Sequence, residues 1–126
     1  MSFFYITDEA PVGDRYGEDI AVLSAGGEID YAASPQLRER LADCISAGGR
    51  RLVLDLSAVT FIDSTALGAL VGAVVRLHEA GGGALAVVCA DENRRVLRIF
   101  EIAGVESLIA LHSSREEALL ELAMAG

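Results

Sequence analysis

Residues 60–70 read TFIDSTALGAL and mark the passage from a strand to a helix. The apolar run LVLDL at residues 52–56 is typical of a buried strand. A short loop then leads to a helix over residues 67–78, and two good N-cap residues, Asp63 and Ser64, lie where the loop becomes the helix. Free N–H groups and the positive end of the helix dipole favour a phosphate there. Spacing alone favours the simpler interpretation, that both residues only cap the helix.

Strands and helices alternate from residue 50 onward, which predicts parallel strands joined by right-handed crossovers. Two earlier strands predict an antiparallel pair, so the sheet should be mixed. The expected strands cover residues 3–7, 19–25, 52–56, 84–89 and 108–111, with a turn-rich link at 8–17 and a loop at 26–30. The expected helices start at Ser34 as N-cap with Pro35 in the first turn, at the Asp63-Ser64 pair, after Asn93, and at Ser113 or Ser114.

Length and composition limit the class of protein. The 126 residues fit one domain, and 52% are apolar, enough for a self-sufficient aliphatic core. The net charge of -9 argues against nucleic acid as a partner. We expect a cytoplasmic protein without membrane insertion, because the start of the chain lacks signal-peptide features and the longest uncharged apolar run, residues 66–75, is about half a membrane span.

One family signature is present. The run FIDSTALG at residues 61–68, with LDL at 54–56, resembles the signature of the STAS family and, more narrowly, of the bacterial anti-sigma factor antagonists. The resemblance continues in GEID at 27–30 and RRVLRIFEIAG at 94–104, and it covers roughly residues 18–122. It implies one STAS-like α/β domain over residues 1–126, with a mixed, mainly parallel sheet of about five strands and about four helices.

The resemblance also implies a function. In such proteins the serine at the position of Ser64 is phosphorylated by an ATP-dependent anti-sigma serine kinase. The unmodified form binds that kinase and releases a sigma factor, and a phosphatase acting on phospho-Ser64 is an expected further partner. The expected partner-binding residues are Asp30, Asp63, Thr65, Ala66, Leu67 and Gly68. Ala66 stands where the family usually has glycine, and we expect the change to alter how closely a partner's backbone approaches.

Glycines inside the helix at residues 67–78 need a reason, because each costs roughly 1 kcal/mol relative to alanine. One such reason is that a neighbouring element approaches the helix closely at these glycines. We expect Gly68 to face a partner protein and Gly72 to face another helix of this domain.

Alternatives to this function remain. No Ser-His-acid arrangement or GxSxG motif surrounds Ser64, so no enzymatic activity, catalytic residue or cofactor is expected. The cysteines lack zinc-ligand spacing. The carboxylates of Asp30, Asp55 and Asp63 are an alternative set of oxygen ligands for Mg²⁺, although capping or turn chemistry also explains each of them. Asp55 is expected to bond the following loop and hold Ser64 in place. A second functional hypothesis is a STAS-like docking subunit of a stress-sensing assembly or of a lipid ABC transporter.

Overall fold

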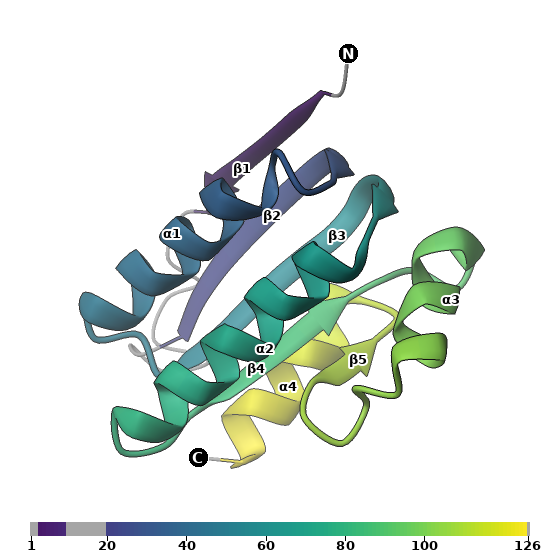
Figure 1. The fold of residues 1–126 in the computed structure, drawn as a ribbon. Coiled ribbons are helices and arrows are strands. Elements are labelled where there is room, and N and C mark those ends of the chain that lie inside the picture. Colours follow the sequence, from purple (N-terminus) through teal and green to yellow (C-terminus); the bar gives the residue numbers. More distant parts are fainter. Residues whose placement is uncertain (1–2, 10–19, 126) are drawn as a thin grey trace.

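The structure, a computed structural model, describes residues 3–9 and 20–125 (Figure 1). Within these residues a sheet has the strand order β1-β2-β3-β4-β5. The strands are β1 (Phe4–Asp8), β2 (Ile20–Ile29), β3 (Arg51–Ile62), β4 (Ala84–Val88) and β5 (Ala110–His112). The helices are α1 (Ser34–Ser46), α2 (Ser64–Glu79), α3 (Arg94–Ala103) and α4 (Arg115–Ala125). β1 is antiparallel to β2 and the other pairs are parallel, which confirms the predicted mixed sheet.

Both faces of the sheet are covered, but unequally. Helices α1, α2 and α3 pack on one face through a large aliphatic core, in which the predicted stripe of Leu37, Leu41 and Ile45 is buried. Helix α4 alone packs on the other face, against a smaller cluster that includes Val53 (Figure 1). Apolar side chains on both sides of β3 follow from this double cover.

β2 is longer than the sequence predicts. The expected loop at residues 26–30 is wrong up to Ile29, because the backbone continues to pair with β3 as far as Ile29 and Ile62. The ring of Tyr5 packs directly on Gly26, where a Cβ would lie 2.3 Å from the ring. The glycine that suggests a turn therefore permits close packing of β1 on β2.

β3 is also longer than predicted. The expected loop between Leu56 and Asp63 is strand, with Ala58, Val59, Phe61 and Ile62 paired to β2. A register shift in the β2–β3 ladder interrupts the alternation of buried and exposed positions, which hides the strand from a pattern search. Asp63 therefore follows directly on a strand instead of on a loop.

The predicted start of α1 needs a correction as well. Ser34 is not an N-cap: it is the first helical residue, it is buried, and its hydroxyl donates to the carbonyl of Tyr31 at 3.3 Å. The N-cap is Ala33, which has no side-chain cap, and Asp30 instead holds the turn before the helix, where its Oδ1 accepts from the N–H groups of Ala32 and Ala33 at 3.0 Å each. The predicted link at residues 8–17 lies almost wholly outside the described residues.

Candidate functional site

Ser64 is the first residue of α2, at the carboxyl end of β3, and it is exposed. The N-cap is Asp63, whose extended backbone turns the chain from strand to helix. Its Oδ1 accepts from the N–H groups of Thr65 at 2.9 Å and Ala66 at 3.2 Å, and its carbonyl accepts from Leu67 N–H at 3.2 Å. The Asp63 side chain thus already bonds two of the free N–H groups at the start of α2, and the Leu67 N–H makes the first ordinary helix bond, so fewer free N–H groups face a phosphate there than the sequence suggests.

The two adjacent hydroxyl groups have different surroundings. The Thr65 hydroxyl donates a short hydrogen bond to Asp63 Oδ1. Among the residues that the structure describes, none bonds the hydroxyl of Ser64. The Ser64 hydroxyl is therefore exposed and free to react, whereas the Thr65 hydroxyl is held in a hydrogen bond to Asp63.

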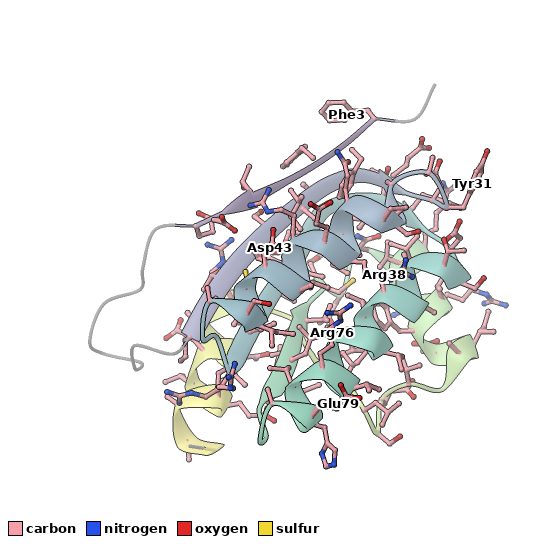
Figure 2. All side chains as sticks on the ribbon, turned by 60° about the vertical axis from the view of Figure 1, so that its left-hand side comes forward. Phe3, Tyr31, Arg38, Asp43, Arg76 and Glu79 are labelled. Atoms are coloured by element: carbon pink, nitrogen blue, oxygen red, sulfur yellow. The ribbon has the colours of Figure 1, made fainter. Side chains whose placement is uncertain are left out.

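Asp30 and Asp63 lie at the same edge of the sheet. They follow the neighbouring parallel strands β2 and β3, and Asp63 N–H donates to the carbonyl of Ile29 at 3.3 Å. Helices α1 and α2, which follow them, lie side by side, and Tyr31 projects outward at the end of the molecule where both helices begin (Figure 2). Tyr31 is 76% exposed, and sequence reasoning missed it. In the sequence it could have been found as a large aromatic residue in the short turn between a strand and a helix.

The side chains of Ala66 and Leu67 do not belong to this surface. They are 1% and 6% exposed and pack in the core beneath α2, so their side chains offer almost no area to a partner. The methyl group of Ala66 therefore fills core space, and the expectation that it limits a partner's approach is not supported.

The outer side of α2 is bare along two glycines. A Cβ at Gly68 or at Gly72 would meet no heavy atom within 4 Å. The expectation that Gly72 faces another helix of the domain is therefore wrong. Spaced four residues apart after Ser64, the two glycines continue one helical line of small residues.

Asp55 is placed away from Ser64. It is buried, its Oδ1 accepts from the N–H and hydroxyl of Ser57, and its Oδ2 accepts from Arg115 of α4 at 2.8 Å. Burial alone would raise the pKa of Asp55, but the hydrogen bonds from Ser57 and Arg115 and the charge of Arg115 hold it below its usual value. Asp55 thus bonds the residues that follow it, as predicted, but anchors α4 instead of holding Ser64.

This placement also contradicts the magnesium hypothesis, since Asp55 is committed to Arg115. Within the described residues no group of three or more His, Cys, Asp or Glu side chains could hold a metal ion.

Burial raises the pKa of the Cys89 thiol to about 11, so the reactive thiolate is disfavoured. No helix in the described part of the chain has the length and apolar character to cross a membrane.

Comparisons with known proteins converge on one family. The family described as STAS domain matches residues 15–118. The anti-sigma-B factor antagonist of Bacillus subtilis (strain 168) is 29% identical over 81% of this chain and 90% of its own length. The protein of the same name from Staphylococcus aureus (strain NCTC 8325 / PS 47) is 31% identical over 86% of this chain and 94% of its own length.

Solved structures share the fold. The crystal structure of an anti-sigma factor antagonist from Mycobacterium paratuberculosis matches with a TM-score of 0.79 at 24% identity, over 95% of this chain and 94% of that one. The Bacillus cell fate determinant SpoIIAA in its phosphorylated form matches with a TM-score of 0.63 at 19% identity, over 93% and 98%. These matches confirm the predicted fold class.

Proposed function

The chain belongs to the STAS domain family, and from that premise we propose that it is an anti-sigma factor antagonist whose binding surface is switched off by phosphorylation of Ser64. The unmodified protein binds an ATP-dependent anti-sigma serine kinase and so releases a sigma factor. It has no catalytic activity of its own and works in the cytoplasm. A phosphatase acting on phospho-Ser64 restores the binding form.

One observation carries this proposal: the hydroxyl of Ser64 is exposed and, among the described residues, unbonded, at the start of a helix whose next outward position is the bare Gly68. A partner's active site can reach the hydroxyl without unfolding anything. The partner's backbone can also approach α2 closely at Gly68, because no side chain projects there.

We define the docking surface as Asp30, Tyr31, Asp63, Ser64, Thr65 and Gly68. It lies where β2 and β3 end and α1 and α2 begin (Figure 2). Tyr31 supplies the exposed aromatic area that protein interfaces favour. Because Ala66 and Leu67 anchor α2 in the core beneath this surface, the docking surface rests on a rigid element.

The local charges account for the off state. A phosphate adds about -1.5 to -2 charge. Asp63 is adjacent, and its side chain already bonds two N–H groups, those of Thr65 and Ala66, that would otherwise help to neutralise an anion. The new charge therefore remains at the docking surface, where desolvating it on binding is costly. Phosphorylation should block docking while leaving the fold alone.

The test is incubation with ATP and an anti-sigma serine kinase from the same organism, followed by mass-spectrometric mapping and by calorimetric titration of the kinase with both forms. We expect one phosphate, on Ser64, and an affinity lower by about tenfold or more in the phosphorylated form. Ser64→Ala is the matched control, which should bind and remain unmodified. Binding without phosphorylation by any such kinase would instead favour a docking subunit of a stress-sensing assembly or a lipid ABC transporter.

A further inference from the structure

We propose that Asp63 determines which of the two neighbouring hydroxyl groups accepts the phosphoryl group, by holding Thr65 in a hydrogen bond and leaving Ser64 free. This inference rests on the proposed function and specifies how its acceptor is selected. The family resemblance points to Ser64, but residue type and position give no physical reason for the choice, since both residues bear a hydroxyl group and both lie in the first turn of α2.

The geometry around Asp63 is one-sided. A single oxygen, Oδ1, accepts from the Thr65 N–H at 2.9 Å, from the Ala66 N–H at 3.2 Å and from the Thr65 hydroxyl. The two N–H bonds fix the carboxylate against the helix end, so the oxygen cannot swing away from the Thr65 hydroxyl without uncapping the helix. Ser64 lies between the two bonded residues, yet its hydroxyl has no partner within the described part of the chain.

This arrangement disfavours Thr65 for a chemical reason. In the transfer, the hydroxyl oxygen forms a bond to the γ-phosphorus of ATP while the bond to the β–γ bridging oxygen breaks, ADP leaves, and the hydroxyl proton passes to a base of the kinase. For Thr65 the proton points at Asp63 Oδ1, which two N–H groups also hold in place, so that hydrogen bond must break before the proton can pass to the base of the kinase.

The cost of freeing Thr65 sets the expected preference. A hydrogen bond to a charged acceptor must be broken before Thr65 can react, which corresponds to a discrimination of about tenfold or more. Ser64 carries no such cost. Removing the Asp63 side chain should therefore raise the ratio of phospho-Thr65 to phospho-Ser64 by about tenfold or more.

The test compares Asp63→Gly with Asp63→Asn. Glycine is tolerated at an N-cap and leaves nothing to hold Thr65, whereas asparagine keeps an acceptor oxygen at the same place. Each variant is treated with ATP and a kinase that phosphorylates the wild-type chain, and both sites are quantified by mass spectrometry. Because the readout is a ratio within one molecule, a change in kinase affinity cancels. An unchanged ratio in Asp63→Gly, or equal use of both residues in the wild type, overturns the proposal.

A second measurement needs no kinase. Nuclear magnetic resonance should detect a slowly exchanging Thr65 hydroxyl proton in the wild type and in Asp63→Asn, and lose it in Asp63→Gly while the core resonances persist. Rapid exchange of that proton in the wild type refutes the selection by Asp63 and leaves the proposed function untouched. A wild-type chain that no kinase phosphorylates refutes the proposed function instead, so the two failures are distinguishable.

Discussion

Replacing Gly68 by leucine should strengthen the fold and weaken docking at the same time. A Cβ at this exposed position meets no heavy atom within 4 Å, so a side chain can leave the helix here without a clash at its first carbon. Leucine is a better helix former than glycine, by somewhat less than the roughly 1 kcal/mol that separates glycine from alanine. For a domain of 126 residues this corresponds to a melting temperature higher by about 2–5 °C.

The same leucine projects from the docking surface towards the partner. Overpacking a closely fitted contact costs roughly 1–3 kcal/mol, which weakens kinase binding by about 5- to 150-fold. Calorimetric titration and a thermal melt on the same sample measure both effects. Gly72→Leu is the matched control: it has the same open surroundings, so its melting temperature should also rise, with a smaller loss of affinity one turn further from Ser64.

Two outcomes would refute this reasoning. A lower stability in either variant would mean that a neighbour packs against α2 after all. A stabilised Gly68→Leu protein with undiminished affinity would place the docking surface elsewhere.

Three further predictions concern the switch and the fold. Ser64→Ala should change the free energy of unfolding by no more than about 0.5 kcal/mol in a urea titration, because Ser64 is exposed and Asp63 provides the cap. Phosphorylation of Ser64 should leave the circular dichroism spectrum unchanged and shift the melting temperature by only a few degrees. A large loss of helix signal would instead show that the switch is conformational. Ser64→Asp should reproduce the loss of kinase affinity only in part, because a carboxylate carries less charge than a phosphate. Arg115→Gln should cost about 1–2 kcal/mol at pH 7, less than a fully buried partner would because the guanidinium is partly exposed. Since the folded-state pKa of Asp55 lies below its ordinary 3.8, the stability that the Asp55–Arg115 pair contributes is present above about pH 4 and is lost as the pH falls further. In urea titrations the difference in unfolding free energy between the wild type and Arg115→Gln should therefore shrink at low pH. A constant difference down to pH 3 would count against the pairing.

Local patterns were enough for the order of the elements. The spacing of Leu37, Leu41 and Ile45 predicts a helix and its buried side, and the structure confirms both. The apolar run at residues 52–56 predicts a buried strand, and the structure confirms it, with apolar clusters on both faces. These signals survive because each depends on residues within one or two turns of each other.

Features that depend on a neighbouring strand were missed. Residues 26–29 and 57–62 carry glycine or polar residues that suggest loops, yet they are strand because β2 and β3 pair along their full length. Backbone pairing with a partner distant in sequence supplies the hydrogen bonds that local propensity does not predict.

The candidate site divides in the same way. The sequence by itself placed Asp63 and Ser64 at the start of a helix, because N-cap chemistry is local. The helical spacing of Leu67, Leu70 and Leu77 also predicts its buried side, which the structure confirms, whereas only the tertiary structure decided what lies around the other residues. Docking on the sheet turns Ala66 and Leu67 inward and leaves Gly68 and Gly72 open, while Asp55 is taken up by Arg115, a residue 60 positions away. The burial of Ala66, the open space around Gly72 and the pairing of Asp55 with Arg115 are set by packing between elements distant in sequence, and no spacing within residues 60–70 encodes them.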